Sequence, residues 1–411
     1  MSLLNNHIVV LGAGYGGMLS AIKISQNIPE ARVTLVDQRD YQLFSFDLYE
    51  VATADEELVS LEQLKKAITL PINNLLKGTK VEYIKSEIKQ IDLKNKQVQI
   101  AGKTLNFDQL IIATGSLSDD YGIKGAKEFA LPLKTLEDAL RIRNQIEFAF
   151  SAHTLDMTKK HLRFVVAGGG YTGCELSAEL LKLKNFLCWK YNYPWEKVEI
   201  LVIEAASELI PGFSKRLSKD AFIRLKDLGV EVLLSGKISE ITSQFIQLTN
   251  GDKLTYDALL WTVGVKGREL DILPKAEADR KNRLVVNEHL QLKGYNNVFA
   301  LGDTALVLNE QGHPVPCSAQ DAIDQAKYLA KNLPVILKNQ KPPKYVPIKH
   351  GFIVCMGGKW AIMDYKGWYI KGFLAYAIDQ FAHIRYLAKL MGWVKASLFV
   401  WFQVKIFGRN D

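Results

Sequence analysis

Residues His7–Asp37, HIVVLGAGYGGMLSAIKISQNIPEARVTLVD, determine the fold of the first part of the chain. A short apolar run leads into a glycine-rich turn, which opens a helix from Gly16 to Asn27. Pro29 ends that helix, and a second apolar run follows at Arg32–Asp37. Strand, helix and strand in this order predict a β-α-β unit with parallel strands.

The turn GAGYGG fits the pattern G-x-G-x-x-G at Gly12, Gly14 and Gly17. The first glycine permits the tight turn, the second leaves room for a pyrophosphate, and the third allows the helix to pack closely on the strand. The helix N-terminus then offers free N–H groups to the phosphates. Asp37 ends the second strand, where a carboxylate can accept hydrogen bonds from a ribose. These features predict a dinucleotide site.

A second unit of the same kind begins 156 residues later. Its first strand is expected at Arg163–Gly168, its turn places Gly170 and Gly173 in the same pattern, and its second strand, Val198–Glu204, again ends in an acid. Glu204 favours NADH, since a carboxylate repels the 2′-phosphate of NADPH. Two units imply two nucleotides, of which the usual pair is a resident FAD and a visiting NADH.

Two later segments are expected to return to the first unit. Thr114 and Gly115 follow one apolar strand, and Gly302 and Asp303 follow another. Asp303 can accept a hydrogen bond from the ribityl chain or the phosphates of a flavin nucleotide. The expected fold class is therefore α/β, with two Rossmann-like domains and a separate C-terminal segment. The expected division is 1–120 with 285–343 for FAD, 121–284 for NADH, and 344–411 for the C-terminal segment.

The C-terminal segment, residues 344–411, holds most of the excess positive charge. The whole chain of 411 residues carries a formal +8, and this segment has ten Lys or Arg, three acids and four of the seven tryptophans. Apolar residues recur at helical spacing with basic residues between them: Phe373, Ala377, Phe381, Ile384, Ala388 and Met391. This pattern predicts an amphipathic region on an anionic membrane surface.

Other interpretations of this segment are weaker. The longest charge-free apolar run, Ala396–Val404, is too short to span a bilayer. No nucleic-acid-binding motif accompanies the charge. A helix pair that covers the core, or a homodimer interface, stays an alternative.

The four cysteines form no C-x-x-C pair, so neither a metal site nor a redox-active disulfide of that type is expected. Cys317 is interpreted as a small buried apolar residue. The N-terminus lacks a basic region and a cleavage site and is interpreted as the approach to the first strand, not as a signal peptide.

Taken together, several segments resemble the type II NADH:quinone oxidoreductase family of two-dinucleotide flavoproteins, over almost the whole chain. The segments are GAGYGG (12–17), LYEVAT (48–53), IIATGS (111–116), GGGYTGCELSAEL (168–180), EAASELIPGF (204–213), LLWTVGVKG (259–267), NVFALGDTA (297–305) and PCSAQDAIDQA (316–326). The resemblance implies that FAD is held by the first glycine turn, Asp37, Thr114, Gly115 and Asp303, and that NADH is held by the second turn and Glu204.

The resemblance also implies two residues at the reacting rings. Glu175 matches a glutamate beside the nicotinamide and the flavin. Ala319 and Gln320 match the start of an A-Q-x-A-x-Q element near the flavin and the quinone. The sequence departs from this element, because Asp324 stands where the family has its second glutamine, and Gln325 follows one residue later.

The expected function is non-proton-pumping NADH:quinone oxidoreduction, in which hydride passes from NADH to FAD and two electrons then pass to a membrane quinone. The enzyme is expected to be peripheral, on the cytoplasmic face of the cell membrane or of an equivalent energy-transducing membrane. A reductase with another acceptor and a low-turnover NADH-sensing flavoprotein are the alternatives. Sulfide:quinone chemistry is disfavoured, because no cysteine precedes Cys174.

Overall fold

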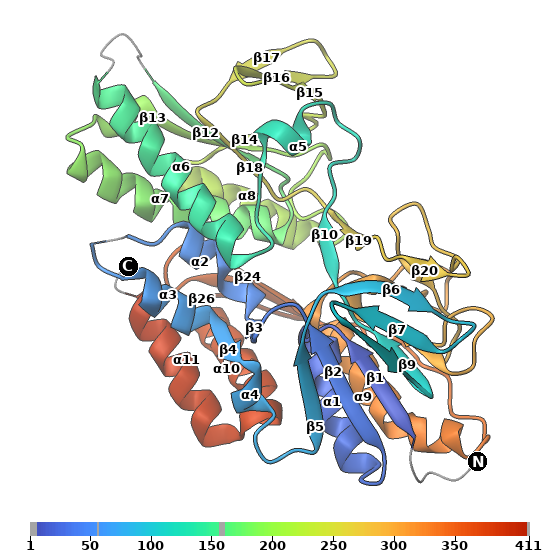
Figure 1. Ribbon diagram of the computed structural model, residues 1–411. Helices are drawn as coiled ribbons and strands as arrows, with labels where there is room; N and C mark the ends of the chain where they lie inside the picture. The colour runs from blue at the N-terminus through green and yellow to red at the C-terminus, as the bar shows by residue number, and fades with distance from the viewer. Residues whose placement is uncertain (1–5, 56, 156–160, 409–411) are drawn as a thin grey trace.

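The computed structural model describes residues 6–55, 57–155 and 161–408, so the first five residues of the chain lie outside the described part. Two parallel sheets of five strands, each flanked by helices, carry the two β-α-β units (Figure 1). This arrangement confirms the expected α/β class with two Rossmann-like domains.

The first sheet has the order β22-β9-β1-β2-β5. Its strands come from distant parts of the chain: β1 His7–Leu11, β2 Arg32–Asp37, β5 Val81–Lys85, β9 Gln109–Ile112 and β22 Val298–Ala300. Helix α1, Tyr15–Asn27, crosses from β1 to β2 and packs along α9, Ala319–Leu337 (Figure 1). The sheet is complete only when β22 returns to pair with β9.

The second sheet has the order β11-β18-β12-β13-β14. Its strands are β11 Leu131–Pro132, β12 Leu162–Ala167, β13 Val198–Ile203, β14 Glu231–Leu233 and β18 Ala258–Trp261. Helix α7, Tyr171–Lys190, crosses from β12 to β13 and continues well beyond the strands. This extension, together with the loop after it, accounts for the long spacing between Gly170 and Glu204.

An antiparallel ribbon joins the two domains: β10, Ser116–Ser118, pairs with β19, Val265–Gly267. Soon after the ribbon, β20, Ile272–Leu273, pairs with β6, Ile88–Asp92, in a small sheet of the first domain. Because β20 pairs with β6, the chain returns to the first domain near Gly267. This return comes earlier than the expected boundary at residue 284.

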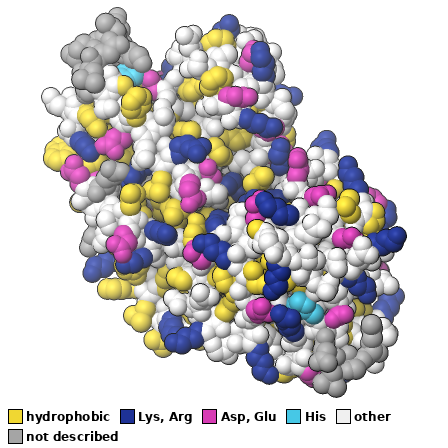
Figure 2. Space-filling view, in the orientation of Figure 1, with side chains coloured by type: hydrophobic (Ala, Val, Ile, Leu, Met, Phe, Trp, Pro, Cys, Tyr) yellow, Lys and Arg dark blue, Asp and Glu magenta, His cyan; other side chains and the backbone are white. Residues whose placement is uncertain are grey.

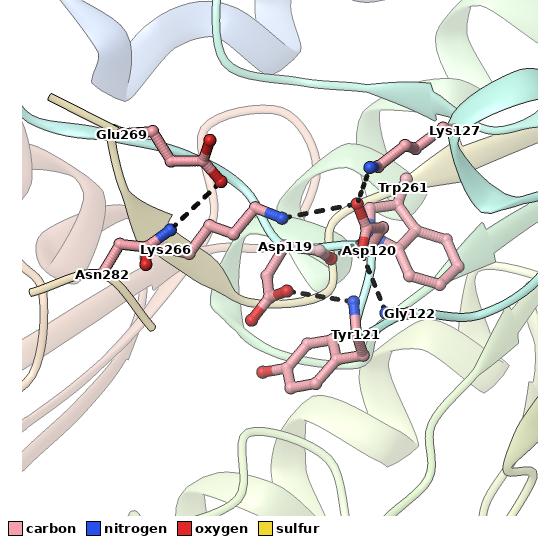
Figure 3. A network of polar contacts seen from close by, with 9 residues as sticks. All are labelled: Asp119, Asp120, Tyr121, Gly122, Lys127, Trp261, Lys266, Glu269 and Asn282. Carbon is pink, nitrogen blue, oxygen red and sulfur yellow. Dashed lines mark hydrogen bonds and ion pairs between the residues drawn. The ribbon is translucent and has the colours of Figure 1, made fainter. Parts of the chain in front are cut away.

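The ribbon is fastened to the second domain by a polar network (Figure 3). The indole N–H of Trp261 donates to the Asp119 carbonyl at 2.8 Å, which ties the end of β18 to the chain leaving β10. The Asp120 carboxylate lies 3.5 Å from Lys127 Nζ and 3.4 Å from Lys266 Nζ, and it accepts the Gly122 N–H at 2.9 Å. Asp120 thus bridges both connections between the domains.

The first half of the C-terminal segment forms a small antiparallel sheet that the sequence did not predict. Its strands are β24 Phe352–Cys355, β25 Ala361–Tyr365 and β26 Trp368–Gly372. The sheet packs on α8, Lys215–Asp227, where the Asp220 carboxylate accepts the Tyr369 hydroxyl at 2.6 Å and pairs with Lys371 at 3.0 Å. Residues 352–372 are therefore docked on the second domain.

The second half forms two adjacent helices, α10, Phe373–Met391, and α11, Trp393–Phe407. Their outer faces expose large apolar side chains: Phe373, Leu374, Phe381, Trp393, Val394, Leu398 and Trp401. Figure 2 shows apolar and basic side chains together along the edge where α11 lies in Figure 1. Within the described residues, no helix combines the length and the apolar character needed to cross a bilayer.

Candidate active site

The first glycine turn packs tightly on one side and is open on the other. A Cβ on Gly12, where φ is +98°, would lie 2.3 Å from the Ala113 carbonyl oxygen, and one on Gly17 would lie 1.9 Å from the Gly12 carbonyl oxygen. A Cβ on Gly14 would meet nothing within 4 Å and would project into the central cavity. The turn therefore has the cradle that the pyrophosphate of FAD needs.

The acids that end β2 and β13 hold the two turns in the same way. Asp37 accepts the N–H groups of Ala13 at 2.7 Å and Arg39 at 2.8 Å. Glu204 accepts those of Gly169 at 2.6 Å and Ala206 at 2.7 Å. Each carboxylate thus supports its own loop.

The predicted middle of the flavin site is brought together by a residue that the sequence did not single out. Thr304 accepts the N–H of Gly115 at 2.9 Å, and its hydroxyl lies 3.3 Å from that of Thr114. Ser116, also missed, donates to Asp303 at 2.6 Å. The contacts join loops that are 187 to 190 residues apart. The sequence signal that could have indicated Thr304 is its place directly after Asp303.

A single cavity of about 930 Å³ connects these elements. Both glycine turns open on it through Gly14 and Gly170. The same cavity is lined by Gly115, Gly302, Asp303, Glu175, Ala319 and Gln320. Most of the residues predicted to bind FAD or to act at the reacting rings therefore meet in one space. The predicted residues that do not line the cavity are Gly12, Gly17, Asp37, Thr114, Gly173 and Glu204.

Glu175 lies on α7 in the wall of this cavity and begins a chain of buried polar groups. Its carboxylate accepts the Cys355 N–H at 3.3 Å, and the Cys355 thiol donates to Asp379 at 3.8 Å. His383 Nε2 lies 3.5 Å from the same Asp379 oxygen. Burial, reinforced by the negative charge of Asp379, raises the pKa of Glu175 well above its ordinary value. A carboxyl that keeps its proton can donate a hydrogen bond as well as accept one.

A further acid, Asp47, lies under the C-terminal helices. Burial raises its pKa to about 6, against the opposing effect of His383. The Gln403 side chain on α11 donates to Asp47 at 2.6 Å. His383 is enclosed by Phe44 and Phe46, with ring centroids 5.2 and 5.1 Å away. No local pattern marks this group, because its members come from segments more than 300 residues apart.

Asp324, which stands where the family's A-Q-x-A-x-Q element has its second glutamine, changes the wall of the cavity at the start of α9. Gln320 and Asp324 both line the cavity. Gln325 does not replace the missing glutamine, because its side chain is buried and accepts the Gly302 N–H at 2.7 Å. The residue that faces the cavity at this turn of α9 is therefore an acid.

All four cysteines carry free thiols. Cys317 also lines the cavity and is only partly buried, so the prediction of a small buried apolar residue was wrong. Its pKa is raised to about 11 by burial, with the negative charge of Asp303 adding to the effect. A thiol with such a pKa stays protonated and is a poor nucleophile.

Fold and cavity together define a flavoprotein class that binds two dinucleotides. The family model described as pyridine nucleotide-disulphide oxidoreductase matches residues 6–326. The type II NADH:quinone oxidoreductase of Staphylococcus saprophyticus is 30% identical over 393 residues, which are 94% of this chain and 96% of the relative. The enzyme of the same name from Staphylococcus aureus is 30% identical over 358 residues, 85% and 87% of the two chains. The chain belongs to the type II NADH:quinone oxidoreductase family.

Solved structures show the same fold. NDH2 from Plasmodium falciparum in complex with NADH has a TM-score of 0.83 at 22% identity, covering 98% of this chain and 99% of that chain. The sulfide:quinone oxidoreductase from Aquifex aeolicus has a TM-score of 0.75 at 21% identity, covering 94% and 91%. At these identities the likeness extends to the fold alone.

Proposed function

We propose that this protein oxidises NADH and reduces a membrane quinone, with FAD as the carrier between them. The observation that carries the proposal is that both glycine turns, Glu175 and Gln320 open on one cavity. Bound FAD supplies the two-electron chemistry, and the chain supplies binding, orientation and shielding from water.

The residues proposed to hold FAD are Gly12, Gly14, Gly17, Asp37, Thr114, Gly115, Gly302 and Asp303, to which Thr304 and Ser116 are added. The open side of Gly14 and the contacts between Gly115 and Thr304 support this assignment. We propose that Gly170, Gly173 and Glu204 hold NADH, and that Glu175 positions its nicotinamide. Ala319 and Gln320 are proposed to lie where the quinone meets the flavin. We propose residues 1–120 with about 268–343 as the FAD domain.

We propose that the enzyme works at the cytoplasmic face of an energy-transducing membrane, where NADH is available. The exposed apolar side chains of α10 and α11, interspersed with Arg385, Lys389, Lys395 and Lys405, support binding to an anionic bilayer. The docked sheet at 352–372 supports a narrower membrane-binding region than 344–411, with the lipid contact concentrated on residues 373–407.

The experiment is an anaerobic one in two steps. Purified protein with its flavin is mixed with NADH, the flavin absorbance is followed, and a short-chain quinone is then added. Rapid bleaching and rapid recovery are expected. Bleaching without recovery would favour a reductase with another acceptor, and absence of bleaching would contradict hydride transfer from NADH altogether.

A further inference from the structure

One end of the central cavity is lined by ionisable side chains for which the function above gives no role. Asp324 and Lys327 follow Gln320 along the cavity face of α9. His350 reaches the same place from the segment before β24. Helix α10 closes the opposite side with Arg385 and Lys389.

Asp324 and His350 form a close pair. Asp324 Oδ2 lies 2.8 Å from His350 Nε2, whereas Asp324 Oδ1 pairs with Lys327 Nζ at 2.5 Å. Asp324 Oδ2 and His350 Nε2 are both shielded from solvent. Within the described residues, neither atom makes a hydrogen bond of suitable geometry. The Asp324 side chain is 10% exposed and the His350 side chain 20% exposed. Asp324 is therefore the more enclosed of the two groups, and the exposed area of the His350 side chain comes from atoms other than Nε2.

The reaction needs one proton from solvent in every turnover. NADH, one proton and a quinone give NAD⁺ and a quinol. The hydride carries two electrons and one hydrogen, so the second quinol hydrogen must enter the cavity as a proton. This requirement rests on the proposed function, and a general acid within reach of the quinone oxygen is the usual means of meeting it.

We propose that Asp324 and His350 deliver this proton to the quinone. The Nε2–H bond of the His350 imidazolium breaks as an O–H bond forms on the Asp324 carboxylate. That O–H bond then breaks as an O–H bond forms on a quinone carbonyl oxygen, which leaves a carboxylate and a neutral imidazole. A proton from solvent restores the imidazolium before the next turnover. The quinone gains the two electrons that NADH supplied, and no further reactant is needed.

The surroundings suit this role. Charged and titratable groups face the pair from three directions: Asp321 and Lys327 on α9, Tyr345 before His350, and Arg385 and Lys389 on α10. The cations outnumber the acids, which favours negative charge that develops on the quinone oxygen. Burial and the neighbouring Lys327 lower the pKa of Lys389 to about 8, which is consistent with a crowded cationic wall.

The other Asp–His pair of the cavity, Asp379 with His383, is less suited. The His383 side chain is 9% exposed and its ring lies against Phe44 and Phe46. It therefore offers no comparable edge to solvent. This pair provides an internal comparison for the experiment.

The test separates the two half-reactions of the holoenzyme by anaerobic stopped-flow. Asp324→Asn and His350→Gln are expected to leave flavin reduction by NADH within about twofold of wild type. Reoxidation by a short-chain naphthoquinone is expected to slow on the order of a hundredfold, the usual contribution of a general acid. Added imidazole should restore part of the rate in His350→Gln, which a merely structural role would not allow. The exposed His313→Gln is the matched control and should change neither step.

A second readout does not depend on turnover. Calorimetric binding of 1,4-naphthoquinone to the oxidised protein should stay within a few-fold in both variants, because the proton is needed only on reduction. Reoxidation of Asp324→Asn at the wild-type rate would overturn the proposal. The proposal would also be overturned if reoxidation were slowed and rescued by imidazole in His383→Gln and not in His350→Gln. Failure of the wild-type protein to react with quinone would instead refute the proposed function itself.

Discussion

We propose two functions for Glu204, support of its loop and selection of NADH. The residue is 9% exposed, and its carboxylate accepts two backbone N–H groups of its own loop, as Asp37 does in the first domain. The same negative charge is available to repel a 2′-phosphate. Substitution at Glu204 therefore affects loop stability and cofactor choice together.

Glu204→Ala is expected to weaken NADH binding and to lower the preference for NADH over NADPH. The two N–H groups would lose their partners, at a cost of about 1–3 kcal/mol each if left unsatisfied. Dissociation constants for both nucleotides would measure this. Asp37→Ala is the matched control, because it should loosen FAD and leave the ratio of the two constants unchanged. An unchanged ratio in Glu204→Ala would contradict the role in selectivity.

Asp47 makes the stability of the protein depend on pH. Its pKa is raised from 3.8 in the unfolded chain to about 6 in the fold. Between these values the folded state keeps a proton that the unfolded state has released. Stability from this group is therefore full below about pH 4 and is lost as the pH rises through about 6.

Asp47→Asn is expected to remove that dependence and to raise the unfolding free energy at pH 7 by up to about 3 kcal/mol. Asparagine keeps an oxygen that can accept the Gln403 amide hydrogen. Urea unfolding of the holoprotein at pH 4 to 7 would measure the difference, with the exposed Glu310→Gln as control. A difference in unfolding free energy between wild type and variant that is the same at every pH would contradict the raised pKa of Asp47.

At the residue scale, local patterns predicted the glycines and the two acids, because a turn and a strand end lie within one β-α-β unit. Thr304, Ser116 and His350 were missed. Their partners lie in distant segments, and a threonine or histidine has no local pattern that marks such contacts. The fold, not a motif, brings His350 to the cavity and joins Thr304 and Ser116 to the loops beside it.

At the scale of elements, the C-terminal segment combines two structures with different tasks. The sheet at residues 352–372 packs on α8, and its Cys355 N–H supports Glu175. Helices α10 and α11 present the apolar surface. The sequence predicted the helices by their spacing. It did not predict the sheet, because its aromatic and basic residues suit a membrane interface equally well.

Because the C-terminal segment divides into a docked sheet and two helices with exposed apolar side chains, membrane binding should be tested on the helices alone. Removing all residues after 366 would delete β26 and its contacts with α8, and would damage the cavity as well as any anchor. Replacing Trp393, Leu398 and Trp401 together by serine removes apolar surface from side chains that are 57–61% exposed. Binding to anionic liposomes is expected to weaken roughly a hundredfold or more, since each such side chain contributes about 1.5–3 kcal/mol when buried.

The control replaces Phe148 and Trp189, which are 64% and 74% exposed on the second domain, by serine. These changes should leave liposome binding as it was. Unaltered binding by the triple variant would assign the anchor elsewhere. Light scattering of the same variant would reveal whether this surface instead joins two copies of the chain.

At the scale of the whole molecule, the orientation of the two domains decides whether nicotinamide and flavin meet. The connecting ribbon is short, and Asp120 ties it to Lys127 and Lys266 (Figure 3). Rates of transfer are sensitive to small displacements of the reacting groups. The network therefore belongs to the positioning machinery although it binds neither nucleotide.

Asp120→Asn is expected to slow flavin reduction at saturating NADH by roughly twofold to tenfold, with NADH affinity nearly unchanged. Stopped-flow at several NADH concentrations separates the two quantities. Glu240→Gln removes the ion pair between Lys124 and Glu240, which does not include Asp120, and should have no effect. A change in affinity alone would contradict a role in domain orientation.

The late position of β22 in the sequence affects how the first sheet folds during synthesis on the ribosome. Strand β9 ends at Ile112, and its partner β22 begins at Val298, so about 185 residues must be made before the first sheet can close. At usual synthesis speeds that interval is roughly 10 to 40 s. The unpaired edge of β9 is exposed during this interval, and all strands of the second sheet, which end with β18 at Trp261, are made before β22. Nascent chains should therefore acquire NADH affinity before they can retain a flavin.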